Sequence, residues 1–246
     1  LKTFFAFGVY GTSALTAVTA QNTMGVTAVH AIPADVVRAQ IDAVTSDLPP
    51  TAVKTGMLAT RELVGTVADA LGEGRGGRYV LDPVMVATRG ARLLEADAES
   101  AVRDRLVPLA DVVTPNLREA EILTGRAIED LDGMRRAARA LVDMGAASAL
   151  VKGGHLEGEA VDLFWDGVRE HVWRKPRLDT PHTHGTGCTL SAAICAGLAR
   201  GDELAAAARL AVAWVHVAIA TAPGLGGGHG PVNHFAPVGR KASGRS

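Results

Sequence analysis

Apolar and polar positions follow two patterns along the chain. Short apolar runs that stop at a glycine, a proline or a charged residue predict β-strands at residues 13–20, 26–32, 52–55, 79–82, 111–114 and 149–152. Longer stretches with apolar residues three and four positions apart predict amphipathic helices at residues 33–48, 60–71, 97–106 and 132–144. Strands that alternate with helices favour an α/β fold, in which a largely parallel sheet is covered by helices on both faces.

The beginning and the end of the chain add two expectations. Residues 1–5 have the pattern of the middle of a helix, so we expect a segment before them. The long apolar stretch from Leu204 to Pro223 is Ala-rich and is interrupted by Arg209 and His216, which predicts a buried helix rather than a membrane span. No long linker divides the chain. We therefore expect one domain over residues 1–246, with a flexible tail at residues 239–246.

Composition and charge narrow the class of protein. Apolar residues make up 48% of the chain and charged residues 21%, which is typical of a folded globular protein. Lysine and arginine number 25 against 26 aspartate and glutamate residues, with no basic stripe, so we expect no nucleic-acid partner. Cys188 and Cys195 lie seven positions apart in one predicted helix, too far along its axis for a disulfide. We expect a reducing, cytoplasmic location.

The densest chemistry lies in a Gly-rich turn that runs into an Ala-rich helix. Gly185, Thr186, Gly187 and Cys188 form this turn. Glycines let the backbone approach a ligand, and the free N–H groups at a helix start attract anions such as phosphate. The same helix start would lower the pKa of Cys188 and suit it to act as a general base. A tight turn followed by a buried cysteine explains the pattern equally well.

Two further alternatives concern metal binding and strand ends. His182, His184 and Cys188 lack the second ligand pair that a zinc site would show. Asp82 ends one predicted strand, and Lys152 ends another before two glycines, which suits a cation aimed at phosphate. A lysine at a strand end is, however, usually solvated. The chain has no P-loop motif, so a kinase here would belong to another class.

Asn116 and Glu119 also allow two interpretations. They lie three positions apart at a predicted helix start just after a strand. There an amide can bind phosphate and a carboxylate can hold the waters of Mg²⁺. On these residues alone, the favoured interpretation is that Asn116 is the N-cap of the helix, with Glu119 as its capping-box partner.

Eight short motifs occur in order along the chain. They comprise residues 1–4, 19–23, 54–58, 81–85, 114–116 with Glu119, 151–155, 184–188 and 228–231. Together they resemble the hydroxymethylpyrimidine phosphate kinases of thiamine biosynthesis, in the ribokinase-like superfamily, from Leu1 to about Phe235. The resemblance implies a central, mainly parallel sheet with helices on both faces. It also implies ATP as phosphate donor, Mg²⁺ as cofactor and a homodimer.

The resemblance implies a role for each matching residue. Gln21, Met57 and Val84 would line the pyrimidine pocket. Lys152, Asn116 and Thr183 would contact the phosphates of ATP, and Asp82 and Glu119 would organise Mg²⁺. Gly185, Thr186, Gly187 and Cys188 would form the anion hole, with Cys188 as the base. Many superfamily members carry Asp at that position, whereas Cys is typical of this branch and of some pyridoxal kinases.

Two alternative functions remain open at this point. One is a pyridoxal or pyridoxine kinase, because some of those enzymes share the Cys188 pattern. The other is a catalytically silent, ribokinase-like binding protein. The family has a strand, a Gly-rich turn and an Asp before the position of Leu1, and a sheet without that strand would have exposed edges. We therefore expect that a segment is missing from the sequence and that a fragment without it would be weakly active or inactive.

Overall fold

The computed structural model describes residues 1–85, 94–154 and 159–239. All predicted strands and helices fall within these ranges. The predicted tail lies outside them except for Gly239, and so does His155 of the sixth motif.

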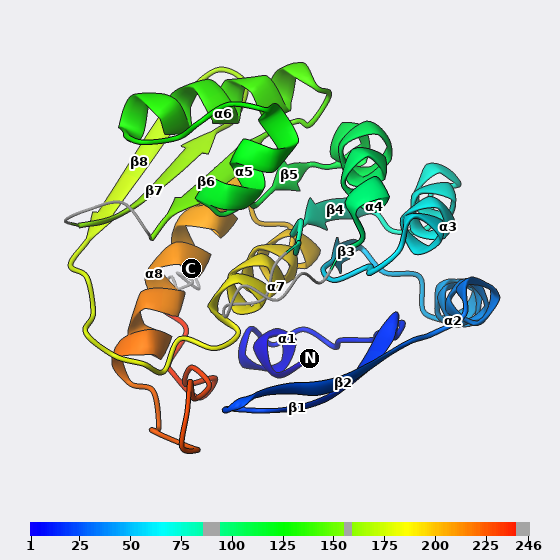
Figure 1. Cartoon of the computed structure of the whole chain (residues 1–246), viewed down its shortest axis with the longest axis horizontal. Helices are drawn as coiled ribbons and strands as arrows, with labels where there is room; N and C mark the ends of the chain where they lie inside the picture. Colours follow the sequence, from blue (N-terminus) through cyan, green and yellow to red (C-terminus); the bar gives the residue numbers. More distant parts are fainter. Residues whose placement is uncertain (86–93, 155–158, 240–246) are drawn as a thin grey trace, which may run out of the picture.

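The centre of the structure is a six-stranded sheet. Its strands lie in the order β3 (Ala52–Thr55), β4 (Arg78–Leu81), β5 (Val112–Val113), β6 (Ala149–Gly153), β7 (Ala160–Trp165) and β8 (Glu170–Lys175). Strands β3 to β6 are parallel, and β7 and β8 complete the sheet as antiparallel strands (Figure 1). The predicted α/β class is confirmed. The sequence patterns did not identify β7 and β8, because β8 is half-buried and has no apolar run.

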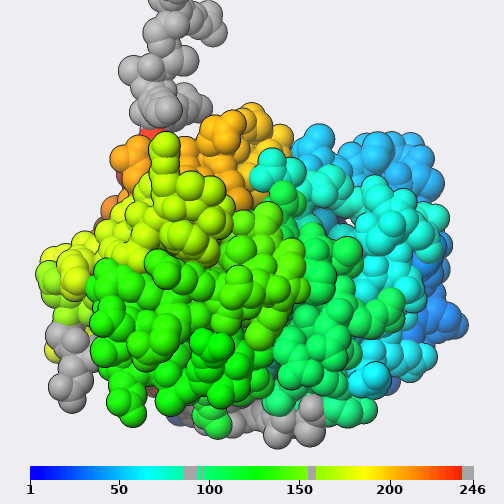
Figure 2. Space-filling view, turned by 90° about the horizontal axis from the view of Figure 1, so that it is seen from above, coloured from blue at the N-terminus to red at the C-terminus, as the bar shows by residue number. Residues whose placement is uncertain are grey.

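Helices cover both faces of the sheet (Figure 1). One face carries α3 (Arg61–Gly72), α4 (Ala96–Ala101), α5 (Leu117–Thr124) and α6 (Leu131–Asp143), and the other carries α1 (Lys2–Ala6), α7 (Thr186–Ala199) and α8 (Leu204–Ala220). Seen from above, the cyan and green residues of the first group form a continuous layer (Figure 2). A π-helical turn (Val102–Leu106) and a 3₁₀ turn (Val107–Leu109) extend α4. Within the described ranges, no helix is long and apolar enough to cross a membrane.

Alternation along the central strands explains why both faces are covered. Successive residues of a strand point to opposite faces of the sheet, so an entirely apolar strand must be buried on both faces. In β4, Leu81 packs with the core under α3 to α6, whereas Val80 packs with the core under α7 and α8. Val113 and Val112 divide in the same way in β5. The two cores hold the sheet between them.

The first two predicted strands do not join this sheet. They form a separate antiparallel hairpin of β1 (Ala17–Asn22) and β2 (Gly25–Ala31), which lies at the bottom of Figure 1. The expectation that residues 13–20 and 26–32 contribute to the parallel sheet is therefore wrong. Most residues of the hairpin are exposed, because no helix layer covers it.

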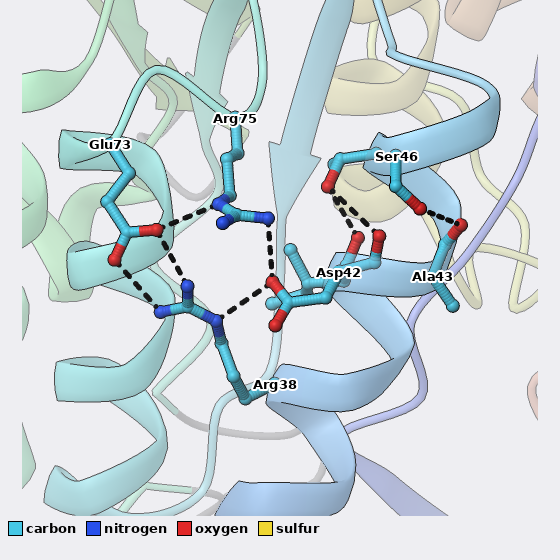
Figure 3. Close-up of polar contacts among 8 residues, drawn as sticks. Arg38, Asp42, Ala43, Ser46, Glu73 and Arg75 are labelled. Carbon is cyan, nitrogen blue, oxygen red and sulfur yellow. Dashed lines mark hydrogen bonds and ion pairs between the residues drawn. The ribbon is translucent and has the colours of Figure 1, made fainter.

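An ion-pair network fixes α2 (Ala34–Asp47), the helix after the hairpin, to the turn that follows α3 (Figure 3). Arg38 reaches Glu73 at 2.6 Å and Asp42 at 2.9 Å, and Arg75 reaches the same two carboxylates at 2.8 Å each. Hydrogen bonds from Arg38 and Arg75 hold the pKa of Glu73 below its ordinary value. Single surface pairs contribute little, but a closed network holds several side chains in one geometry. The hairpin is thus connected to a firmly held helix.

Candidate active site

Candidate functional side chains gather at the carboxyl edge of the parallel strands. Because β3 to β6 run in the same direction, their ends meet at one edge of the sheet. Lys54 lies near the end of β3, Asp82 directly follows β4, Asn116 follows β5, and Lys152 lies near the end of β6. The backbone of Lys152 donates a hydrogen bond to Pro115 (2.9 Å), which ties the last two of these loops together.

Asp82 is the centre of the cluster. Its side chain is almost fully buried and accepts hydrogen bonds from Lys152 Nζ (3.3 Å), Ser191 Oγ (3.0 Å) and Thr114 Oγ1 (3.5 Å). Burial by itself would raise the pKa of Asp82. The positive charges of Lys152 and Lys54 and the Ser191 hydroxyl outweigh burial, so the pKa lies below its ordinary value. Asp82 is therefore a carboxylate at neutral pH.

Lys152 keeps its positive charge in this environment. Burial would lower its pKa, but the carboxylates of Asp82 and Glu119 raise it above the ordinary value. The ammonium group lies against the start of α7, since a Cβ atom on Gly187 would come within 3.2 Å of Lys152 Nζ. A residue with a side chain at position 187 would crowd this ammonium group. The lysine is thus held beside the helix start rather than in open solvent, which excludes the solvated strand end considered above.

The start of α7 has the predicted geometry of a Gly-rich turn. Gly185 is the N-cap residue with a φ of 79°, a left-handed conformation that favours glycine. Thr186 donates a hydrogen bond from Oγ1 to the Thr183 carbonyl at 2.6 Å, which closes the turn. Within the described part of the chain, the amides of Gly187 and Cys188 have no backbone acceptor. These N–H groups and the positive end of the helix form a place suited to an anion.

Cys188 is the third residue of α7, and its side chain is exposed. Desolvation by the surrounding protein and the negative charge of Asp82 raise the pKa of the thiol, against the opposing effect of Lys54 and Lys152. The expectation of a lowered pKa for Cys188 is therefore wrong. Cys195 is buried in the core as expected, and burial raises its pKa to about 12.

Asn116 and Glu119 form the capping box considered above. The Asn116 side chain accepts from Glu119 N, and the Glu119 side chain accepts from Asn116 N, both at 2.9 Å. The cap uses only the oxygen of the Asn116 amide, so its NH₂ group stays available to a phosphate. Burial raises the pKa of Glu119, and the charge of Asp82 adds to the rise. Asn116 can therefore cap the helix and still offer its NH₂ group to a phosphate.

The acidic residues fit a magnesium ion that arrives with a nucleotide. Among the described residues, no group of three or more His, Cys, Asp or Glu side chains could hold a metal by itself. Mg²⁺ commonly keeps several waters and is bound by one or two carboxylates and the substrate's phosphates. Asp82 and Glu119 match this second arrangement. The zinc alternative has no support among these residues, and His182 Nδ1 already accepts a hydrogen bond from Gly230 N (3.2 Å).

The three expected pyrimidine residues lie on different parts of the structure. Met57 follows β3 and Val84 follows β4, so both half-buried side chains lie along the sheet edge that carries Asp82. Gln21 is exposed on the hairpin, where its Oε1 accepts from Thr19 Oγ1 at 3.5 Å. Thr16 Oγ1 donates to the Met57 carbonyl (2.8 Å) and connects the base of the hairpin to the loop after β3.

A Gly-rich segment, residues 224–230, connects the tip of the hairpin to the turn before α7. His229 N donates to the Thr23 carbonyl (3.0 Å), and Gly228 N donates to Thr23 Oγ1 (3.3 Å). On its other side, His184 N donates to the Gly230 carbonyl (3.1 Å). We call residues 224–230 the strap, because they contact both the hairpin and the segment that leads into the anion site.

The sequence patterns did not single out three members of the cluster. Lys54 is the next-to-last residue of β3, as Lys152 is of β6, so a search for charged residues near strand ends would have found it. Ser191 lies three positions after Cys188, one helical turn away, and this spacing was a usable signal. The sequence offered no signal for Thr114, because a threonine at the end of an apolar strand is usually part of the strand.

A model of one protein family matches residues 1–233, and that family is described as phosphomethylpyrimidine kinase. The chain belongs to the phosphomethylpyrimidine kinase family. The resemblance inferred from the eight motifs is confirmed. A hydroxymethylpyrimidine/phosphomethylpyrimidine kinase from Rhizobium meliloti is 55% identical over 241 residues, which are 96% of this chain and 90% of the relative.

Solved structures of two related proteins share the fold. An ADP complex of Bacillus subtilis pyridoxal kinase matches with a TM-score of 0.88 and 38% identity, over 96% of this chain and 90% of that one. A phosphomethylpyrimidine kinase from Clostridium difficile matches with a TM-score of 0.79 and 39% identity, over 87% of this chain and 89% of that one. The ribokinase-like fold predicted from the motifs is confirmed.

Proposed function

We propose that the protein is an ATP-dependent kinase of thiamine biosynthesis. It phosphorylates 4-amino-5-hydroxymethyl-2-methylpyrimidine and then phosphorylates the monophosphate to the diphosphate. The observation that carries this proposal is the joining of Lys152, Asp82 and the first turn of α7 at one sheet edge, in a member of the phosphomethylpyrimidine kinase family. A cation, a carboxylate and free backbone amides are the groups that phosphoryl transfer requires.

On this proposal, the phosphates of ATP lie on the β5 and β6 side of the edge. Lys152, the NH₂ group of Asn116 and Thr183 bind them. The amides of Gly187 and Cys188 stabilise the phosphoryl group while it moves, with Gly185 and Thr186 shaping the turn that exposes them. Because these groups are already in place, no reorganisation is needed at the moment of reaction.

Mg²⁺ would be held through its waters by Asp82 and Glu119, and when bound it offsets the negative charge of the phosphates. Burial raises the pKa of Glu119, and the charge of a bound Mg²⁺ would favour its carboxylate form. Asp82 stays ionised through Lys152 and Lys54, so it can take part without a change of protonation.

The acceptor lies on the β3 and β4 side of the edge. Met57 and Val84 pack against the pyrimidine ring, and Gln21 hydrogen-bonds its amino edge when the hairpin covers the ring. Cys188 lies between the two sides and takes the proton of the acceptor hydroxyl. Since its pKa is raised, this requires the thiol to lose a proton first, and the reaction therefore gains from alkaline pH.

A pyridoxal kinase is the nearest alternative, because the Bacillus subtilis pyridoxal kinase shares the fold over 96% of this chain. The 55% identity to a hydroxymethylpyrimidine/phosphomethylpyrimidine kinase favours the pyrimidine. The physical argument is that Gln21 offers a donor and an acceptor to an aminopyrimidine. A site built for such bonds discriminates against a ring that leaves them unpaired.

The test is a steady-state assay of the purified protein with ATP and each acceptor. We expect a higher kcat/KM for hydroxymethylpyrimidine than for pyridoxal. Gln21→Ala should raise the KM for the pyrimidine, whereas Thr27→Ala, a change of another exposed hairpin side chain, should not. Equal or higher kcat/KM for pyridoxal would overturn the substrate assignment, and no turnover with either acceptor would favour the silent binding protein.

We further propose that the protein works in the cytoplasm as a homodimer, with no nucleic-acid or membrane partner. The hairpin is the proposed interface, because it exposes apolar side chains on a sheet that no helix covers. These side chains are those of Val18, Met24, Val26 and Val29. Val18 is opposite His30 and Val29 is opposite Thr19, so the two valines lie on opposite faces, and a second copy of the hairpin would bury the apolar side chains of the face that it covers.

A further inference from the structure

A second lysine approaches Asp82 from the side opposite Lys152. Lys152 belongs to β6 and lies 3.3 Å from Asp82 Oδ1, whereas Lys54 belongs to β3 and lies 4.0 Å from Asp82 Oδ2. In the strand order β3-β4-β5-β6, these two strands lie on either side of β4, which carries Asp82. The two ammonium groups therefore approach one carboxylate from two sides.

Asp82 has closer partners than Lys54. Oδ1 of this carboxylate already pairs with Lys152, and Oδ2 accepts a hydrogen bond from Ser191 at 3.0 Å. At 4.0 Å, the contact of Lys54 with Oδ2 is too long for a hydrogen bond, and no other described residue forms an ion pair with it. A mostly buried ammonium group with so loose a partner is costly to retain unless it meets an anion during function.

Lys54 lies on the side of Asp82 that the proposed function assigns to the acceptor. It precedes Gly56 and Met57, the loop that the proposed function assigns to the pyrimidine, and a Cβ on Gly56 would come within 3.5 Å of Lys54 Nζ. Its charge also reaches Cys188, whose pKa it lowers in opposition to desolvation. An anionic group on the acceptor, placed near Cys188, would therefore meet the ammonium group of Lys54.

The two acceptors of the proposed function differ in this respect. The first is a neutral alcohol, which gains little from a second cation. The second is a phosphate monoester with a second pKa of about 6, so it is mostly a dianion at neutral pH. We propose that Lys54 binds the phosphate of the monophosphate acceptor and thereby allows one site to perform both transfers. This inference rests on the proposed function.

The second transfer needs no protein base. An oxygen of the acceptor phosphate attacks the γ-phosphorus of ATP, the new P–O bond forms, and the bond from the γ-phosphorus to the bridging oxygen breaks. ADP leaves with that electron pair. The dianion has no proton to lose, so Lys54 supplies charge and position, whereas Cys188 serves only the first transfer.

The experiment compares kcat/KM for the alcohol and for the monophosphate, each measured separately with ATP. Lys54→Met should lower both values, because it also alters the charge around Asp82. It should lower the value for the monophosphate a further 10- to 100-fold, mainly through KM, as expected for the loss of one charge-assisted hydrogen bond. Lys54→Arg, which keeps the charge, should restore most of the ratio between the two acceptors.

Two matched lysine variants serve as controls. Lys152→Ala should lower both values alike, by about 10²-fold, because it removes charge from the phosphoryl group common to both reactions. Lys175→Met removes a lysine that pairs with Asp162 at 3.2 Å on the far strands, and it should leave the ratio unchanged. Circular dichroism and thermal unfolding check that each variant is folded.

An equal loss for both acceptors in a folded Lys54→Met protein would overturn the proposal. If that variant does not fold, ionic strength replaces it. In the unmodified protein, added salt should then raise KM for the monophosphate more than for the alcohol, and an equal response would contradict the role of Lys54. Failure of the unmodified protein to phosphorylate the alcohol would instead count against the proposed function itself.

Discussion

At the scale of single residues, Cys188 is the group whose role depends most on its surroundings. An alcohol must lose a proton to become a good nucleophile, so loss of the base should cost on the order of 10²–10⁴-fold in the first transfer. The second transfer starts from a dianion and needs little help. Cys188→Ala should therefore impair alcohol phosphorylation far more than monophosphate phosphorylation, and single-turnover rates for the two acceptors measure the difference.

The pKa of Cys188 sets the direction in which the rate of the first transfer changes with pH. The thiolate is the active form, and the raised pKa makes it scarce at neutral pH. The rate of the first transfer should therefore rise from pH 7 to about pH 9, near and beyond the usual thiol pKa, and Cys188→Ala should abolish the rise. Cys188→Asp, a carboxylate base, should restore activity with a profile displaced to lower pH. Equal losses in both transfers would mean that Cys188 shapes the helix start and moves no proton.

At the scale of elements, the strap joins the hairpin to the anion site. Gly226 has a φ of 83°, and a side chain there would collide with Thr23 at the tip of the hairpin. Gly226→Ala should therefore displace the hairpin and lower kcat/KM for the pyrimidine by more than about tenfold, since misplacing a binding element by 1 Å can cost 10²-fold. Steady-state kinetics at saturating ATP measure this loss.

A second glycine, Gly8, allows the effect of the collision with Thr23 to be separated from the effect of backbone strain. Gly8 has a φ of 72° with open space around it. Gly8→Ala therefore introduces the same kind of backbone strain as Gly226→Ala, but no collision. We expect Gly8→Ala to lower the midpoint of thermal unfolding but to leave acceptor KM unchanged. A matching loss of kcat/KM in both variants would show that strain alone reduces activity and that the strap does not position the hairpin.

At the scale of the whole molecule, the exposed apolar side chains of the hairpin predict that two copies of the protein associate. Sedimentation velocity should give a particle of twice the 25.4 kDa of one chain. Val18→Lys places a charge among the apolar side chains of the hairpin and should shift the particle to a monomer. Val168→Lys is the matched control, because Val168 is 81% exposed on the turn between β7 and β8, away from the hairpin. A monomer in the unmodified protein would contradict the proposal.

The central strands and most helices were predictable because their signals are local. Residues 52–53, 79–81 and 149–151 are apolar on both faces, and this pattern needs no knowledge of neighbours. The hairpin was misplaced because an exposed antiparallel strand and a buried parallel strand can have similar short apolar runs. Whether such a run is covered depends on which helices reach it, and that depends on packing between distant segments.

For the candidate site, residue type and strand-end position identified Asp82, Lys152 and the turn of Gly185 to Cys188. The sequence could not indicate how these groups affect one another. It predicted a lowered pKa for Cys188 from the helix start alone, whereas desolvation and Asp82 raise it. It also offered Asn116 and Glu119 as either cap or ligand, and the structure shows that the cap leaves the amide NH₂ free.

The sequence by itself determined the α/β class and the family and indicated the carboxyl edge as the candidate site, because periodicity and motifs are written along the chain. Only the tertiary structure decided that Lys54 and Lys152 meet one carboxylate from two sides, and that residues 224–230 join the hairpin to α7. The physical reason is that charge interactions and contacts depend on distances through space, and residues 70 or 200 positions apart approach one another only after folding.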